Sequence, residues 1–241
     1  MKKIFFTIQV FILFLCLTIT NLGCKGKLND ATEHYDIGVL HWQQGRIDDA
    51  IEEYKKAITI YPKFEMGHYN LGSMYYEKGD IGLAIESFKK AIEIKPDLVE
   101  AHTMLGVAYE MYNMYQDAVE QYQKALELNP DQAETYTNLG NLYYKMEKYD
   151  DAIEEYKKAI VINPTFAEAY NNLGYVYYET DKYSFAINEF KKAIELKQDY
   201  ISAHTNLSMA YRKVGLHDQS TEEIEIAKQL ALKQQADQRQ R

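Results

Sequence analysis

The sequence predicts an all-α solenoid of stacked antiparallel helix pairs, and two observations support this fold class. The four prolines of the chain, Pro62, Pro96, Pro130 and Pro164, recur every 34 residues. Glycines recur at the same spacing at 38, 72, 106, 140 and 174, and alanines at 50, 84, 118, 152 and 186. A fixed period of this length indicates a repeat protein, in which each repeat packs only against its neighbours.

Each repeat has the pattern of two helices. With position 1 set at Ala31, Glu65, Val99, Ala133, Ala167 and Ile201, proline occupies position 32. Positions 4, 7, 8 and 11 then lie on one face of a first helix, because a helix turns by about 100° per residue. Positions 20, 24 and 27 form the facing stripe of a second helix. Proline ends that helix because it has no backbone N–H to donate.

The glycine at position 8 requires a packing explanation. Glycine in a helix interior costs about 1 kcal/mol relative to alanine. Its recurrence predicts that the two helices of a pair approach closely there, with small residues at positions 8, 20 and 27. Tyrosine or phenylalanine at positions 11 and 24 would fill the space beside them.

The segment from Tyr170 to Ile194, "YNNLGYVYYETDKYSFAINEFKKAI", resembles the tetratricopeptide repeat family. The resemblance extends over residues 31–232 and implies a right-handed superhelical solenoid of six repeats. These are 31–64, 65–98, 99–132, 133–166, 167–200 and a degenerate cap at 201–232, preceded by a short tether at 25–30 and followed by a polar tail at 233–241. The cap has Ser208, Ser220 and Ile224 where the other repeats have glycine, alanine and an aromatic residue.

Residues 1–24 have the layout of a secretory signal peptide, with two lysines before an apolar run that starts at Ile4. Its ending, Leu22-Gly23-Cys24, resembles the lipobox of bacterial lipoproteins, which would make Cys24 the lipidation site, although Asn21 departs from that motif. The resemblance implies export to the bacterial cell envelope and a lipid anchor at the periplasmic face or outer membrane. An inner-membrane signal anchor and an ordinary cleaved signal are the alternatives.

Composition and motifs exclude several classes of function. A formal net charge of −9 disfavours nucleic acid as a partner, because binding to phosphates needs a basic face. No motif for catalysis, metal binding or a cofactor occurs, so we expect neither an enzyme nor a cofactor. Histidines at position 4 (His34, His68, His102 and His204) are interpreted as packing substitutes for an aromatic residue, because successive repeats are too far apart to share one ion.

The repeated "AIEEYKKAI" motif is interpreted as a solvated face rather than a site. Its glutamates at position 22 and lysines at position 26 predict i,i+4 ion pairs, such as Glu52 with Lys56 and Glu154 with Lys158. The turn position that holds Gly45, Gly79 and Gly215 is occupied by Glu147 in the fourth repeat, which the pattern does not explain.

The candidate site is the face of the first helices opposite the core, at positions 2, 5, 6, 9, 12 and 13. Asparagine recurs at position 6 as Asn70, Asn138, Asn172 and Asn206, although it is a poor helix former. Beside these lie Tyr69, Tyr76, Asn141, Tyr144, Asn171, Tyr175 and Tyr178. Amides can both donate to and accept from a peptide unit, and tyrosine adds contact area.

In the family resembled, this face lines a concave groove, where an asparagine ladder is similar to those that grip the backbone of an extended peptide. The sequence therefore predicts a protein-interaction scaffold or assembly factor with a protein or peptide partner, held at the membrane by its N-terminus. Two alternatives remain. Asparagine could simply be the family consensus at position 6, and the array could be a rigid spacer or self-association module that makes contacts through its ends or convex face.

Overall fold

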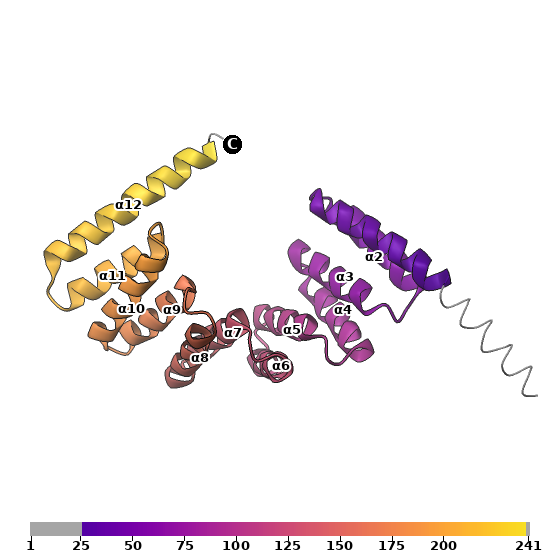
Figure 1. Ribbon diagram of the computed structural model, residues 1–241, viewed down its shortest axis with the longest axis horizontal. Coiled ribbons are helices and arrows are strands. Elements are labelled where there is room, and N and C mark those ends of the chain that lie inside the picture. Colours follow the sequence, from indigo (N-terminus) through magenta and orange to yellow (C-terminus); the bar gives the residue numbers. More distant parts are fainter. Residues whose placement is uncertain (1–25, 240–241) are drawn as a thin grey trace, which may run out of the picture. The chain divides into compact units, whose positions relative to one another are not determined.

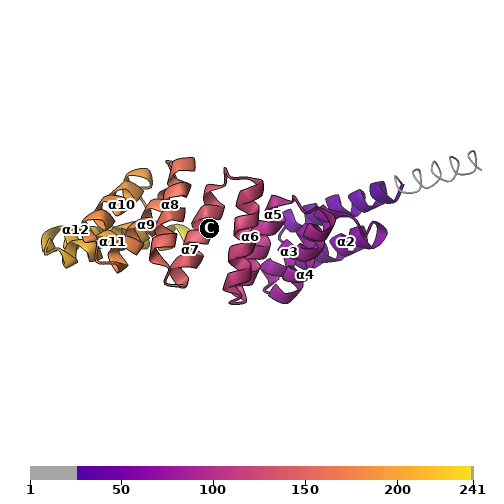
Figure 2. The ribbon, with the colours of Figure 1, turned by 90° about the horizontal axis from the view of Figure 1, so that it is seen from below.

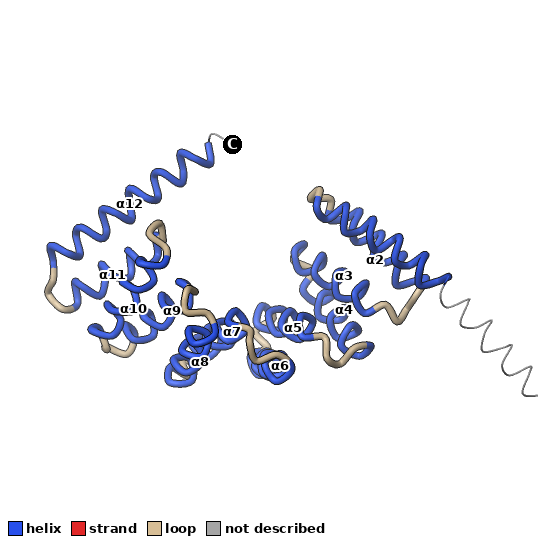
Figure 3. The backbone as a smooth tube through the Cα atoms, in the orientation of Figure 1, coloured by secondary structure: helices blue, strands red, loops and turns tan. Residues whose placement is uncertain are grey.

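The computed structural model describes residues 26–239, which form twelve helices and no strand (Figures 1 and 3). The predicted all-α fold of tandem helix pairs is confirmed. The predicted signal peptide at 1–24 and the lipidation site Cys24 lie outside the described residues. Between residues 26 and 239, no helix is long and apolar enough to cross a membrane.

The described residues divide into two compact units, 26–113 and 114–239. The described part of the N-terminal unit contains a helix at 26–43, α2 (Ile47–Ile60), α3 (Glu65–Lys78), α4 (Ile81–Ile94) and α5 (Val99–Met111). The C-terminal unit contains α6 (Tyr115–Leu128), α7 (Ala133–Lys145), α8 (Tyr149–Ile162), α9 (Ala167–Glu179), α10 (Tyr183–Leu196), α11 (Ile201–Lys213) and α12 (His217–Arg239). Figure 2 shows α7 beside α8 and α9 beside α10, and both pairs are in contact.

The described helices extend beyond the expected ends of the repeat array on both sides. Residues 26–30, expected as part of a tether, are helical and continuous with the first helix. Residues 233–239, expected as a polar tail, are the last turns of α12. Neither segment contains a proline, which would end the neighbouring helix.

The core confirms the close approach predicted at position 8. A Cβ atom added to Gly140 would lie 2.7 Å from the ring of Tyr156, and one added to Gly72 would lie 2.8 Å from the ring of Phe88. These rings at position 24 are at most 2% exposed. The last repeat differs, because Ile224 replaces the ring and Ser208 replaces the glycine. Ser208 is buried and donates to the carbonyl oxygen of Ser220 at 2.7 Å.

The turn inside each repeat needs a left-handed residue. Gly79 has φ of 86° and Gly215 has φ of 80°, and Glu147 adopts 59° at the equivalent position. Asn113 and Asp181 also take positive φ there, as short polar side chains tolerate better than most. Glutamate has no such tolerance, so the fourth repeat bears a strained turn.

The surface charges pair differently from the expected i,i+4 pattern. The lysine at position 26 binds a glutamate three residues away, as in Lys56 with Glu53 at 2.6 Å and Lys158 with Glu155 at 2.8 Å. The preceding lysine, at position 25, lies over the position-11 tyrosine of the next repeat: Lys55 over Tyr75, Lys89 over Tyr109 and Lys191 over Tyr211. These lysines therefore connect adjacent repeats rather than only covering a solvated face.

Position 4 closes the turn between repeats. The Nε2 atoms of His68, His102 and His204 lie 3.0–3.1 Å from the carbonyl oxygens of Pro62, Pro96 and Gln198. In the fifth repeat the hydroxyl of Tyr170 donates to the equivalent oxygen of Pro164 at 3.3 Å. Histidine thus replaces an aromatic residue whose polar tip makes the same bond. Among the described residues, no three His, Cys, Asp or Glu side chains are grouped to hold a metal ion.

Candidate functional site

Four asparagines from three helices of the C-terminal unit form a chain of hydrogen bonds, which we call the amide relay. Asn141 belongs to α7, Asn171 and Asn172 to α9, and Asn206 to α11. Nδ2 of Asn206 donates to Oδ1 of Asn171 at 3.0 Å, and Nδ2 of Asn171 donates to Oδ1 of Asn172 at 3.2 Å. Nδ2 of Asn172 then donates to Oδ1 of Asn141 at 2.9 Å. Successive repeats are thereby joined through side chains.

The relay ends on a core residue. The hydroxyl of Tyr156, on α8, donates to Oδ1 of Asn141 at 2.7 Å. Only the hydroxyl of this position-24 side chain reaches the face, because its ring is buried against Gly140. The equivalent residues Phe88 and Phe190 have no such hydroxyl. From the sequence, Tyr156 was expected only to pack in the core. The presence of a hydroxyl at position 24, in place of phenylalanine, was the feature that could have indicated its hydrogen bond to the relay.

A cavity of about 230 Å³ opens beside the relay, and we call it the relay cavity. It is lined by Asn141, Tyr144, Tyr156, Asn171, Asn172, Tyr175 and Val176. Its volume exceeds the roughly 150 Å³ of an engineered protein cavity that binds benzene. One large side chain of a partner would therefore fit. Its walls combine three tyrosines and a valine with three asparagines of the relay.

Five tyrosine rings continue from the cavity along α7 to α10, and we call them the tyrosine row. Their centroids lie 5.6–6.3 Å apart in the order Tyr149, Tyr144, Tyr175, Tyr178 and Tyr183. Lys213 lies over the last two rings, with Nζ 5.9 and 5.8 Å from their centroids. The hydroxyl of Tyr183 is hydrogen-bonded to the carboxylate of Asp181. Such a row offers contact area at low cost in side-chain entropy.

The two tyrosines of the row that line the cavity, Tyr144 and Tyr175, have raised pKa values. Burial, followed by the nearby Tyr175 and Glu179, raises the pKa of Tyr144 to about 12. Burial and then the charge of Glu179 also raise the pKa of Tyr175. Both side chains are consequently neutral near pH 7, and Glu179 contributes negative charge at the rim of the cavity.

In the described part of the N-terminal unit, Asn70 makes no hydrogen bond to another asparagine. Nδ2 of Asn70 lies within hydrogen-bond distance of two hydroxyls, those of Tyr35 at 3.0 Å and Tyr54 at 3.5 Å. Tyr69 packs on the ring of Phe88 and against the buried cluster that contains Leu98. These predicted site residues thus take part in internal contacts.

The remaining predicted residues are distributed as follows. Asn138, Tyr76, Tyr144 and Tyr178 are half-buried. In the fourth and fifth repeats position 5 is buried rather than exposed, contrary to the helical wheel: Thr137 is 2% exposed and Asn171 6%. A wheel for one helix omits the adjacent repeat, which covers this position in the stack. Asn171 therefore holds the relay together from inside, and it also borders the cavity.

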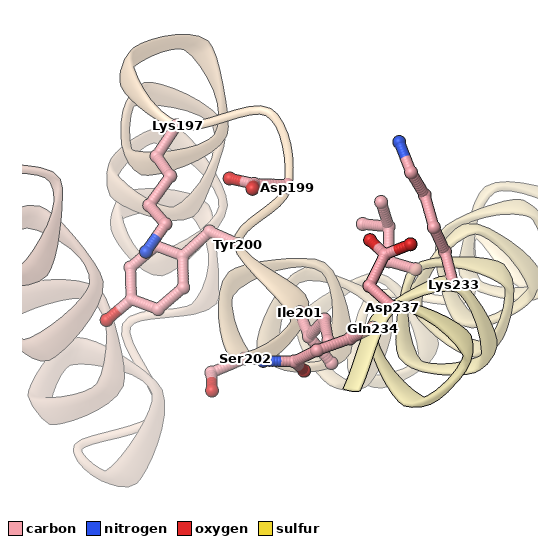
Figure 4. A pocket seen from close by; sticks show the side chains of 9 residues that line it. Lys197, Asp199, Tyr200, Ile201, Ser202, Lys233, Gln234 and Asp237 are labelled. Carbon is pink, nitrogen blue, oxygen red and sulfur yellow. The ribbon is translucent and has the colours of Figure 1, made fainter. Parts of the chain in front are cut away.

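A second cavity of about 430 Å³ lies between the α10–α11 turn and the last turns of α12 (Figure 4). Lys197, Asp199 and Tyr200 line it from the turn, and Lys233, Gln234 and Asp237 from α12. Nζ of Lys197 lies 5.1 Å from the ring centroid of Tyr200. Because its two lysines and two aspartates balance, this cavity selects for no charge.

Comparisons with known proteins agree with this architecture. A family model described as TPR repeat matches residues 38–79, 72–111, 113–147, 140–181 and 174–215. The crystal structure of MamA is 30% identical, with a TM-score of 0.64, and the match covers 69% of this chain and 97% of that one. No curated protein sequence matched.

Two further solved structures have lower identity and support the fold alone. PilF of Pseudomonas aeruginosa is 18% identical with a TM-score of 0.74, over 90% of this chain and all of that one. YrrB, described as a TPR protein with an unusual peptide-binding site, is 20% identical with a TM-score of 0.60, over 73% of this chain and 91% of that one.

Proposed function

The chain belongs to the tetratricopeptide repeat family, and from this premise we propose that it is a protein-interaction scaffold that holds an extended polypeptide segment at the relay cavity. The observation that carries the proposal is the amide relay, in which asparagines from the first helices of three successive repeats form one connected polar surface beside a cavity. A solenoid that presents such a surface can bind a chain running across its repeats.

The chemistry of the surface fits a polypeptide better than a small charged ligand. Amide groups match the donors and acceptors of a peptide backbone, and the tyrosine row supplies rigid contact area for side chains. Among the described residues, no cluster of side chains could hold a metal ion. The lining of the cavity includes no lysine or arginine that could bind a phosphate. YrrB, a protein of the same fold with an unusual peptide-binding site, supports a peptide as the ligand class.

Photocrosslinking tests where the segment binds. A benzophenone amino acid replaces Tyr144, which lines the cavity, and in a matched variant replaces Tyr76, the residue at the same repeat position in the N-terminal unit. We expect Tyr144→benzophenone to crosslink one defined peptide segment in cells and Tyr76→benzophenone to crosslink it weakly or not at all. Equal crosslinking at both positions, or none at Tyr144, would contradict the assignment.

A crosslinked partner also needs a test against the alternative of a spacer or self-association module. If a variant lacking residues 201–241 lost the partner while Asn172→Ala retained it, contacts through the end of the array would be favoured. The exposed Leu216 and Leu232 in that last repeat, at 44% and 67%, are the surface such contacts would use. Crosslinking of a second copy of the chain at Tyr144 would also favour this alternative.

We also propose that the protein acts at the bacterial cell envelope, anchored through a lipid on Cys24. The support is the sequence of residues 1–24, with its apolar run and its Leu22-Gly23-Cys24 ending. Fractionation of cells that express the wild type and Cys24→Ala tests it. We expect the wild type in the membrane fraction and Cys24→Ala in a soluble one. A Cys24→Ala protein that stays with the membrane would point instead to an uncleaved signal anchor.

A further inference from the structure

We infer that the relay cavity selects a neutral side chain that ends in a hydrogen-bond acceptor, with glutamine as its best representative among the standard residues. This inference rests on the proposed function, because it specifies which part of a bound polypeptide enters the cavity. It follows from the direction of the amide relay, the charge at the rim and the nature of the walls.

The three hydrogen bonds between the side-chain amides of the relay all run in the same direction. Each Nδ2 donates toward the N-terminal side of the array, from Asn206 to Asn171, to Asn172 and to Asn141. Oδ1 of Asn141 therefore accepts two hydrogen bonds, one from Asn172 and one from Tyr156. An amide oxygen has two lone pairs, so this oxygen is saturated.

The N–H groups of Asn141 are left for a ligand. Among residues 26–239, Nδ2 of Asn141 has no hydrogen-bond acceptor, and Asn141 lines the relay cavity. If a ligand without an acceptor covered this donor, the donor would lose its hydrogen bond to water and form none in exchange, which costs binding free energy. A side-chain carbonyl or carboxamide oxygen would accept from Nδ2. Lysine and arginine side chains only donate, so they do not match Asn141.

The rim disfavours a negatively charged side chain. Glu179 lies close enough to raise the pKa of both Tyr144 and Tyr175, which stand on the cavity wall. A carboxylate ligand would meet the same field and be repelled. Lys213 does not offset this, because its ammonium group is placed over Tyr178 and Tyr183, farther along the tyrosine row. The acceptor that fits is therefore uncharged.

The walls require an apolar stem below the acceptor. The rings of Tyr144 and Tyr175 pack edge to face with centroids 5.7 Å apart, and Val176 lies beside them. Methylene groups of a ligand would bury their surface against these atoms. The volume of about 230 Å³ accommodates a side chain the size of glutamine. An apolar stem with a carboxamide end satisfies walls and donors together.

Short peptides provide the test. We would titrate ¹⁵N-labelled protein with acetyl-Gly-Ala-Xaa-Ala-Gly-amide, where Xaa is Gln, Leu, Glu or Lys, and follow the side-chain amide signals of Asn141 and Asn172. All four peptides share the backbone that the proposed function requires. The Gln peptide should bind about 3–10-fold more tightly than the Leu peptide, as expected for one net hydrogen bond, and shift the Asn141 signals most. The Glu and Lys peptides should bind no better than Leu.

Asn141→Asp is the matched variant, since it replaces the donor of Asn141 with an acceptor of nearly the same shape. It should reverse the order, so that the Lys peptide binds best, while Asn70→Asp in the N-terminal unit should leave the order unchanged. Circular dichroism checks that both variants keep their helical content. A reversed order of affinities would support the inference, because a merely structural role of Asn141 would weaken the binding of all four peptides alike.

The outcomes separate this inference from the proposed function. If the four peptides bind equally to the wild type, the inference is wrong and the proposed function stands. If the Lys peptide binds best to the wild type, the relay runs in the opposite direction and the inference is also wrong. If no peptide shifts the signals of α7, α9 or α11, the proposed function fails and the inference fails with it.

Discussion

The two units contain the same residue at the same repeat position, yet the environment of that residue differs. Asn70 in the N-terminal unit lies against the hydroxyls of Tyr35 and Tyr54. Asn172 in the C-terminal unit bonds to Asn141 and Asn171. The difference arises at repeat positions 5 and 9, which are tyrosine and serine in the second repeat but include asparagine in the fourth and fifth. An asparagine at position 6 is therefore not a site by itself, because its neighbours decide whether it faces a ligand.

The largest expected effect comes from replacing the glycine at position 8, which lies against the aromatic ring at position 24 in each unit. Gly140→Val should destabilise the C-terminal unit by about 3 kcal/mol, because even its Cβ would lie 2.7 Å from the Tyr156 ring. Displacing that ring should also break the hydroxyl bond to Asn141 and weaken peptide binding. Gly72→Val should be equally destabilising in the N-terminal unit without affecting binding. Hydrogen exchange of α3–α4 and α7–α8 would measure both, and a Gly140→Val protein that binds normally would contradict the link between core and relay.

A smaller effect is expected when the middle of the relay is removed. Asn171→Leu should cost about 2 kcal/mol, since it removes a buried amide and leaves Nδ2 of Asn206 and Oδ1 of Asn172 without their partner. Asn70→Leu should cost less, because Asn70 is only half-buried. Thermal unfolding of both variants measures the difference, and equal losses would mean that the relay adds nothing to the C-terminal unit.

Substitutions in the turn inside a repeat should change stability in opposite directions in the two units. Glu147→Gly should stabilise the C-terminal unit by about 1 kcal/mol, because glycine adopts the φ of 59° without the clash that glutamate suffers. Gly79→Ala should destabilise the N-terminal unit by a similar amount, because its φ is 86°. Chemical denaturation of the two variants checks both signs. A loss of stability in Glu147→Gly would show that the glutamate makes a compensating contact.

The smallest expected difference concerns pH. Burial lowers the pKa of His68 in the folded chain, although its bond to the Pro62 carbonyl acts in the opposite direction. The unfolded chain therefore takes up a proton first as pH falls below about 6.5, and the stability that neutral His68 contributes above that pH is lost. Tyr170 makes the equivalent bond through its hydroxyl. His68→Tyr should reduce the fall in melting temperature between pH 7 and pH 5, and an unchanged fall would exclude His68 as its source.

Much of the scaffold could be predicted from the sequence, because it depends on contacts that repeat. Glycine at position 8 and a ring at position 24 face each other within one helix pair, and their common period reveals that contact. The substitution of both in the last repeat, as Ser208 and Ile224, fits the same reasoning. The strain at Glu147 could be noticed only as an anomaly, since the pattern does not state a backbone angle.

The details of the site were harder to predict, because they depend on contacts between repeats. A helical wheel places Asn171 on the outside, but the next helix covers it. Spacing suggested i,i+4 pairs, whereas Lys56 and Lys158 bind glutamates three residues away. The second role of Tyr156 depends on where its hydroxyl ends, which no residue pattern shows.

The central claim is that the relay cavity of the C-terminal unit, and not the asparagine of the N-terminal unit, holds the partner. The most direct measurement is the dissociation constant of the segment crosslinked at Tyr144 for wild type, Asn172→Ala and Asn70→Ala. We expect about tenfold weaker binding to Asn172→Ala, as for one lost buried hydrogen-bonding group, and unchanged binding to Asn70→Ala. Equal dissociation constants for Asn172→Ala and wild type, or an equal loss in both variants, would contradict the claim.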